Sequence, residues 1–88
     1  MAKVIWRQKA IDDLNDIWEY TLKEWSENQA DKYYETIKIA CKVIGENTNL
    51  GKKYAGISKR LLGFKSEKHI IFYHSVSKEK IEVIRILH

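Results

Sequence analysis

Apolar positions recur at helical spacing in the first half of the chain and alternate with polar positions in the second half. Between residues 8 and 26 they follow i, i+4, i+7 and i+8 spacing, and carboxylates fall on the opposite side. This periodicity predicts an amphipathic helix with one wide apolar face. The face consists of Ala10, Leu14, Ile17, Trp18, Leu22 and Trp25. Because large aromatic side chains usually pack in a core, we expect Trp18 and Trp25 to be buried.

A second helical pattern follows the polar break Ser26-Glu27-Asn28. Ser26 or Asn28 can cap its start, and Gly45 with the polar residues after it ends the pattern. Its apolar stripe is Ala30, Tyr34, Ile37, Cys41 and Ile44. Ile39 and Val43 lie off this stripe, so they either receive apolar side chains of a partner or are covered by residues 54–57. Since the break is short, the two helices should form an antiparallel hairpin.

The remaining segments read as strands. Residues 3–6 form a short β-prone run, and after Gly51 the apolar period changes to about two over residues 58–65, 69–76 and 80–88. Short polar separators at residues 66–68 and 77–79 indicate hairpin turns. The sequence therefore predicts an α+β fold in one domain, residues 1–88. Its order is β-α-α-β-β-β, with a helical hairpin packed on a small antiparallel sheet.

Alternation in the last two strands predicts which face each residue occupies. We expect the even-numbered apolar residues to face the helices: Ile70, Phe72, Val76, Ile84 and Ile86. The odd-numbered residues would then form an open sheet face: Ile71, Tyr73, Val83, Arg85 and Leu87. A final hairpin centred near Glu79 would place Tyr73 opposite Arg85.

Charge is divided unevenly along the chain. Residues 45–88 carry nine Lys and Arg against four Glu, a net charge of +5, whereas residues 1–44 carry seven against eight, a net charge of −1. Such segregation indicates a basic surface that attracts an acidic protein segment or a phosphate backbone, although a solubilising surface is the alternative. The sequence shows no signal peptide and no apolar run long enough to span a membrane, so we expect a cytoplasmic protein with no membrane partner.

Several kinds of chemistry find little support in the sequence. The single cysteine, Cys41, lies on the apolar stripe and is expected to be a buried, inert thiol. The three histidines, His69, His74 and His88, lack the spacing of a metal site, so no metal and no cofactor are expected. Cleavage of RNA by general acid–base chemistry is the enzymatic alternative for which the sequence offers candidate residues. Its candidates are Lys59, Arg60, Tyr73, Arg85 and His88, with Lys65 and His74 as further groups of the same types.

From Val4 to His88 the chain resembles the ParE branch of the ParE/RelE toxin superfamily. The first half matches an apolar strand followed by Ala10, Asp13-Leu14, Ile17, Tyr20, Ala30 and Tyr34. The second half matches a loop glycine, here Gly51, and a basic pair before a strand, Lys59-Arg60-Leu61-Leu62. The most specific pieces are His69-Ile70-Ile71-Phe72-Tyr73 and the ending Ile84-Arg85-Ile86-Leu87-His88 at their observed spacing.

The resemblance implies the toxin of a type II toxin–antitoxin pair. Its partner would be a ParD-like antitoxin with a ribbon-helix-helix DNA-binding part and an acidic segment that wraps the toxin. ParE-like toxins are associated with poisoning DNA gyrase, and RelE-like toxins with cutting messenger RNA on the ribosome. RelE-like nucleases often carry an acid–base Tyr beyond the last strand, and no Tyr follows His88 here, which favours gyrase.

Three functions therefore stand as expectations. The first is a gyrase inhibitor that contacts its target through Lys59, Arg60, Arg85 and His88. The second is a ribosome-dependent endonuclease that uses the same basic residues with Tyr73. The third is a detoxified homologue that binds only antitoxin. In each case we expect the antitoxin to contact Ile39, Val43, Lys59 and Arg60.

Overall fold

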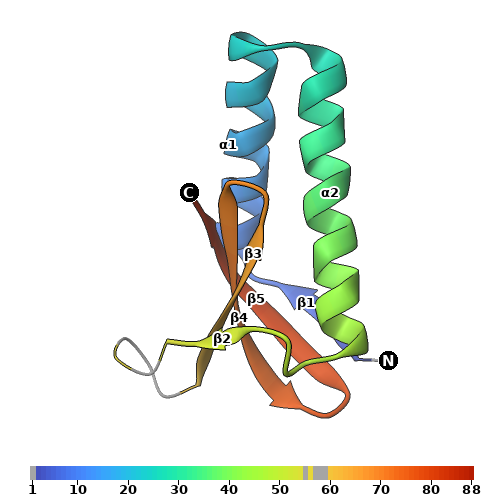
Figure 1. Ribbon diagram of the computed structural model, residues 1–88, viewed down its shortest axis with the longest axis vertical. Coiled ribbons are helices and arrows are strands. Elements are labelled where there is room, and N and C mark those ends of the chain that lie inside the picture. Colours follow the sequence, from blue (N-terminus) through green and yellow to red (C-terminus); the bar gives the residue numbers. More distant parts are fainter. Residues whose placement is uncertain (1, 55, 57–59) are drawn as a thin grey trace.

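The computed structural model describes residues 2–54, 56 and 60–88, which form two helices and five strands (Figure 1). Strand β1 (Lys3–Trp6) leads into the helices α1 (Gln8–Glu24) and α2 (Glu27–Glu46). The strands β2 (Lys52–Lys53), β3 (Leu61–Ser66), β4 (His69–Ser77) and β5 (Lys80–Leu87) follow. The predicted α+β fold, a helical hairpin on a small sheet, is confirmed, with the two-residue β2 as an addition.

The strands form one sheet in the order β1-β5-β4-β3-β2. All neighbouring pairs are antiparallel except β1 and β5, which run parallel with Val4 beside Ile81 and Trp6 beside Val83. Turn residues in the sequence give the relative directions of β3, β4 and β5, but no turn connects β1 to the others. The parallel pairing of the first and last strands was therefore not visible in the pattern.

The two helices begin and end close to the expected residues. Ser26 caps α2, because its hydroxyl oxygen accepts a hydrogen bond of 3.1 Å from the amide of Gln29. Gly45 lies inside the last turn of α2 and not beyond it. The helix ends at Glu46, and the amide of the C-cap residue Asn47 donates to the carbonyl of Val43. A Cβ at Gly45 would lie 3.1 Å from the carbonyl oxygen of Ala2, so glycine lets the helix pack closely on the residue before β1.

The stripe of α2 is buried as predicted, at Ala30, Ile37, Cys41 and Ile44, with Tyr34 half-buried. In α1 only the N-terminal part of the stripe is buried. Trp18 is half-buried and its indole N–H donates to Asp31 over 3.0 Å, while Trp25 is 72% exposed. The hairpin projects beyond the end of the sheet (Figure 1), so the sheet cannot cover its tip. The expectation that Trp18 and Trp25 lie in the core was therefore wrong.

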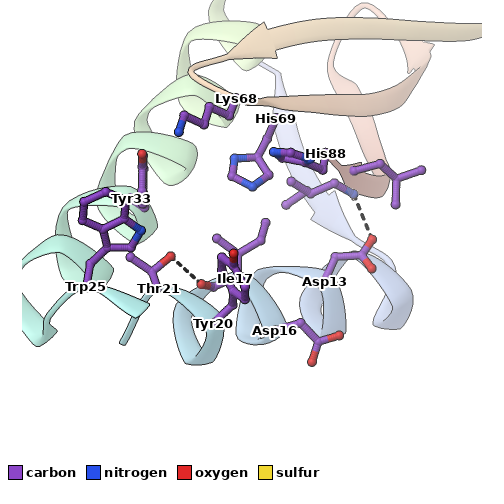
Figure 2. Close-up of a pocket in the computed structure, with 12 residues that line it drawn as sticks. Asp13, Asp16, Ile17, Tyr20, Thr21, Trp25, Tyr33, Lys68, His69 and His88 are labelled. Carbon is purple, nitrogen blue, oxygen red and sulfur yellow. Dashed lines mark hydrogen bonds between the residues drawn. The ribbon is translucent and has the colours of Figure 1, made fainter. Parts of the chain in front are cut away.

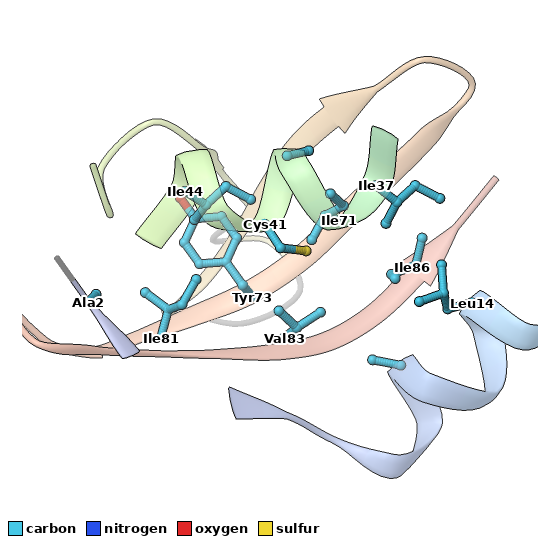
Figure 3. Packing of buried hydrophobic residues seen from close by; sticks show 12 residues of the cluster. Ala2, Leu14, Ile37, Cys41, Ile44, Ile71, Tyr73, Ile81, Val83 and Ile86 are labelled. Atoms are coloured by element: carbon cyan, nitrogen blue, oxygen red, sulfur yellow. The ribbon is translucent and has the colours of Figure 1, made fainter. Parts of the chain in front are cut away.

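The predicted faces of the last two strands were also wrong. Ile71, Tyr73, Ile81 and Val83 are buried beneath the helices (Figure 3). Of the even-numbered set only Ile86 is buried; Ile70, Phe72 and Ile84 are half-buried and Val76 is exposed. On β4 the alternation is regular but opposite to the expectation, with Ile71 and Tyr73 on the buried face. On β5 a β-bulge also intervenes: Tyr73 pairs with Val83 and Phe72 with Arg85, which leaves Ile84 as an extra residue. The extra residue reverses the alternation along β5, so that Ile81 and Val83 before it and Ile86 after it share the buried face. Tyr73 lies opposite Val83 and not opposite Arg85.

Candidate protein-binding site

The residues proposed for target contact are not gathered in one place. Lys59 lies outside the described residues. Arg60 is exposed just before β3, where Leu61 pairs with His74, and His74 in turn pairs with Glu82. His88 follows β5 six residues beyond Glu82, which corresponds to about 20 Å along the strand. The sheet therefore carries Arg60 and His88 towards opposite ends of its strands.

Arg85 is held against α1 and does not project from an open sheet face. Strand β1 pairs with β5 only as far as Val83. Beyond that residue, α1 packs against this edge of β5. There the Asp13 carboxylate accepts two hydrogen bonds from the Arg85 guanidinium, at 2.7 and 2.9 Å, and one of 2.9 Å from the Ile86 amide. Burial raises the pKa of the Asp13 carboxyl, but these hydrogen bonds and the charges of Arg85 and Lys9 lower it by more, so the net pKa lies below its usual value.

Tyr73 is fully buried in the core (Figure 3). Its hydroxyl donates to the carbonyl of Thr48 over 3.0 Å and accepts from the amide of Gly51 over 2.9 Å. Burial raises the pKa of the Tyr73 phenol, and the hydrogen bond from Gly51 offsets part of that rise. A Cβ at residue 51 would lie 2.6 Å from the Tyr73 hydroxyl, which gives a physical reason for the loop glycine of the motif. The hydroxyl thus fixes the loop after α2 and is enclosed by it.

A groove of 560 Å³ opens beside the end of β5 (Figure 2). Helix α1 forms one side, and the turn between β3 and β4 with the end of β5 forms the other. Tyr33 of α2 closes one end. The lining residues are Asp13, Asp16, Ile17, Tyr20, Thr21, Trp25, Tyr33, Lys68, His69, Ile86, Leu87 and His88. We call this feature the β5 groove.

The β5 groove combines exposed aromatic rings with a basic wall. Trp25 is 72% exposed and Tyr20 65% exposed, although both are large enough to bury substantial apolar area. Across from them lie Lys68, His69 and His88 (Figure 2). Grooves that combine apolar surface with a few charged groups are typical of peptide-binding sites.

His69 lies at the centre of the basic wall. Its ring lies 5.6 Å from that of His88 and 6.2 Å from that of Tyr33, both edge-on. Burial lowers the pKa of the His69 imidazole, and the nearby charges of His88 and Lys68 lower it further. Its Nδ1 atom is shielded from solvent and has no hydrogen-bond partner among the described residues. An unsatisfied buried polar atom of this kind costs about 1–3 kcal/mol.

Most of the β5 groove was not predicted from the sequence. His69 and His88 could have been placed together from the hairpin turn, since Ser66 pairs with His69 and Ile70 with Leu87 at the same end of the sheet. Trp25 and Tyr20 were missed because their exposure depends on how far the helices project beyond the strands. No sequence pattern gives that length difference directly.

Other surfaces bear on the remaining expectations. Ile39 and Val43 are 58% and 39% exposed on α2, so they are available to a partner. Burial raises the pKa of the Cys41 thiol to about 12, in keeping with an inert core cysteine. Across the residues that the structure describes, no cluster of three potential metal ligands occurs. Neither helix in that part of the chain is long and apolar enough to cross a membrane.

Comparison with known proteins identifies the family. The family model described as the ParE toxin of the type II toxin–antitoxin system parDE matches residues 4–88. The chain belongs to this family. It is thus a ParE-type toxin of a type II toxin–antitoxin system.

Curated relatives and a solved structure agree with this assignment. The ParE-type chain is 28% identical over 81 residues to Toxin ParE1 of Caulobacter vibrioides, covering 92% of this chain and 82% of the relative. It is 27% identical over 75 residues to Toxin ParE1 of Mycobacterium tuberculosis, covering 85% and 76%. A structure titled "Chromosomal ParDE TA system from P. aeruginosa" shares the fold with a TM-score of 0.84 at 20% identity, covering 100% of this chain and 96% of the other.

Proposed function

We propose that this ParE-type toxin inhibits DNA gyrase by binding it and trapping its cleaved-DNA complex, and that it does not cut messenger RNA. The family match carries the gyrase part of this proposal, and the burial of Tyr73 argues against the nuclease part. A general acid or base must come within hydrogen-bond reach of its substrate, and both hydrogen bonds of the Tyr73 hydroxyl go to the Thr48–Gly51 loop. Arg85, the second candidate for RNA cleavage, is engaged by Asp13.

Membership of the ParE family supports gyrase as the target, because gyrase poisoning is associated with this branch of the superfamily. Lys59, Arg60 and His88 remain the proposed target contacts, whereas Arg85, which is engaged by Asp13, is left out of this set. Arg60 and His88 are exposed, so they can approach an acidic surface or a DNA phosphate. The action would take place in the cytoplasm, where gyrase is found.

A cognate antitoxin is the second proposed partner. We expect a ParD-like protein with a ribbon-helix-helix part and an acidic segment that wraps the toxin. The exposed pair Ile39 and Val43 supports a contact with an amphipathic helix of that segment, and Lys59 and Arg60 would attract its carboxylates.

The target is tested with purified toxin, gyrase and relaxed plasmid, and in parallel with translating ribosomes. We expect loss of supercoiling and an accumulation of cleaved DNA, with messenger RNA left intact. Arg60→Glu should weaken gyrase inhibition more than Lys32→Glu, which makes the same change of charge at an exposed position on α2. Cleavage of A-site codons with supercoiling unaffected would contradict the proposal. If a folded toxin affects neither reaction yet binds antitoxin, the chain is a detoxified homologue.

A further inference from the structure

The face of the sheet that is turned away from the helices carries half-buried apolar and aromatic residues bordered by lysines. We propose that this face binds a single DNA strand, such as a strand end in the cleaved-DNA complex of gyrase, with bases stacked on Phe72 and phosphates beside Lys52 and Lys65. The inference rests on the proposed gyrase target. It adds a direct contact with the DNA to the proposed contacts with the enzyme.

Strand alternation defines this surface, which we call the outer sheet face. The neighbours of its residues along each strand pack in the core, so these residues themselves point away from the helices. Its half-buried members on β1, β3 and β4 are Ile5, Leu61, Ile70, Phe72 and His74. The middle strand of the sheet is β4, so Phe72 and His74 lie near the centre of this face.

Two aromatic rings meet at this centre. Tyr54 packs edge-on against Phe72, with 5.2 Å between the ring centroids. The Tyr54 ring also lies over Gly63, where a Cβ would come within 2.5 Å of the Tyr54 Cε1 atom, so glycine leaves the room that the ring needs. Both rings are half-buried and keep a part that is open to solvent. Aromatic rings on a sheet are a common platform for the bases of a single strand, because every base has a stacking face.

Lysines border the aromatic rings. Lys52 shares the outer sheet face with Phe72, because Lys52 pairs with Gly63 and Gly63 pairs with Phe72. Two strand spacings separate Lys52 from Phe72, about 10 Å, so the long lysine side chain can reach the phosphate of a nucleotide whose base lies on the ring. Lys65 pairs with Ile70 on the same face, and both lysines are exposed.

Little negative charge opposes these lysines. Within the five described strands Glu82 is the one carboxylate, and it accepts a hydrogen bond of 2.8 Å from the Arg7 guanidinium. The outer sheet face therefore has the positive potential that a phosphate backbone requires. An acidic peptide would also be attracted, but it has no planar bases to stack on the rings. Alternating bases and phosphates fit the alternation of aromatic rings and lysines better.

The outer sheet face is continuous with a proposed gyrase contact. Arg60 directly precedes Leu61, which lies on this face beside His74. A DNA strand on the outer sheet face would thus lie next to the part of the toxin that is proposed to contact gyrase. Holding the enzyme and its DNA together is what the trapping of a cleaved complex requires.

Fluorescence anisotropy with purified toxin and a labelled single-stranded DNA of about 16 nucleotides tests the aromatic part. Phe72→Leu keeps an apolar side chain but removes the ring, so affinity should fall at least about fivefold. Phe72→Tyr keeps the ring and should retain affinity. Duplex DNA of the same sequence should bind more weakly than the single strand, because its bases are already stacked on one another.

Salt dependence tests the lysines. Lys52→Gln and Lys65→Gln should each reduce the slope of log affinity against log salt concentration by about 0.7, the value for one phosphate contact with a single strand. Lys32→Gln, at an exposed position on α2, is the control and should leave the slope unchanged. Unchanged slopes for both outer-face variants would overturn the assignment of the phosphates.

The outcomes separate this inference from the proposed function. If the toxin inhibits gyrase but binds the single strand no more tightly than folded Phe72→Leu does, the inference is overturned and the proposed function stands. If single-strand binding depends on Phe72 but gyrase is unaffected, the DNA site stands and the gyrase target fails. If RNA of the same sequence binds far more tightly than DNA, the surface reads the 2′-hydroxyl and the assignment to DNA is overturned. With both proposals correct, Phe72→Leu should also lower the amount of cleaved DNA that gyrase accumulates.

Discussion

Tyr73 shows how a single side chain decides between two chemical interpretations. In the sequence it is a phenol on a basic strand, which is a reasonable proton donor. In the structure it is a core residue whose hydroxyl joins β4 to the loop after α2, through Thr48 and Gly51. The residue type was evident from the sequence, but its role depends on which face of the sheet it occupies.

Tyr73→Phe should therefore destabilise the fold while leaving the activity of folded protein intact. Removing the hydroxyl leaves the Gly51 amide and the Thr48 carbonyl without their partner, at a cost of about 1–3 kcal/mol in the free energy of unfolding. Urea denaturation measures this, and Tyr20→Phe, at an exposed tyrosine, is the matched control. A Tyr73→Phe variant with normal stability and no toxicity would instead indicate that the Tyr73 hydroxyl takes part in catalysis.

At the scale of elements, most of the fold follows from periodicity, and the errors have identifiable causes. Helix stripes and hairpin turns located both helices and β3 to β5 to within a few residues. The bulge at Ile84 was not predictable, since an apolar residue there fits either face of a strand. The reach of the hairpin beyond the sheet likewise depends on packing between distant segments. Both features determine the candidate site, and so the site was harder to predict than the fold.

The contact between α1 and β5 makes a prediction about pH. Asp13→Asn should lower the free energy of unfolding at neutral pH by about 1–2 kcal/mol, because the variant loses a charged acceptor for Arg85 and Ile86. This expected loss lies at the lower end of the range for hydrogen bonds to charged groups, because the Arg85 side chain is 39% exposed and solvent screens the ion pair with Asp13.

The sign of the pH effect follows from the lowered pKa of Asp13. A carboxyl whose folded pKa lies below its usual 3.8 stabilises the fold above that pH, and the contribution disappears as pH falls through the folded value. The difference between wild type and Asp13→Asn should thus be constant near neutrality and shrink below pH 3.8. Asp16→Asn, one turn further along α1, is the control. A difference that persists unchanged in acid would mean that the carboxylate charge contributes nothing.

At the scale of the whole molecule, apolar and basic surfaces are distributed around the chain and do not form a single site. The pair Ile39 and Val43 lies on α2, Arg60 precedes β3, and the β5 groove opens at the far end of the strands. A wrapping partner can engage such separated surfaces together, whereas a small rigid ligand cannot.

Salt should distinguish the two kinds of surface in antitoxin binding. Replacing Ile39 and Val43 by Asp should weaken binding at every salt concentration, because the lost contact is apolar. Replacing Lys59 and Arg60 by Glu should slow association mainly at low salt, since charges are screened beyond about 8 Å at physiological ionic strength. Surface plasmon resonance over a range of NaCl measures both effects. Unchanged kinetics for both double variants, with folding retained, would place the wrapping surface elsewhere.

The position of β5 affects how the chain can fold during its own synthesis. Of the described strands, β5 is made after all the others and lies inside the sheet, between β1, the earliest of them, and β4. Until β5 has left the ribosome, β1 has no strand to pair with and the buried side of the helical hairpin lacks Ile81, Val83 and Ile86. Because these contacts join the two ends of the described chain, a nascent toxin can complete its core only after β5 is made. Synthesis thus gives the cell an interval in which the chain exists without its finished surfaces, and an antitoxin already present can meet the toxin as it folds.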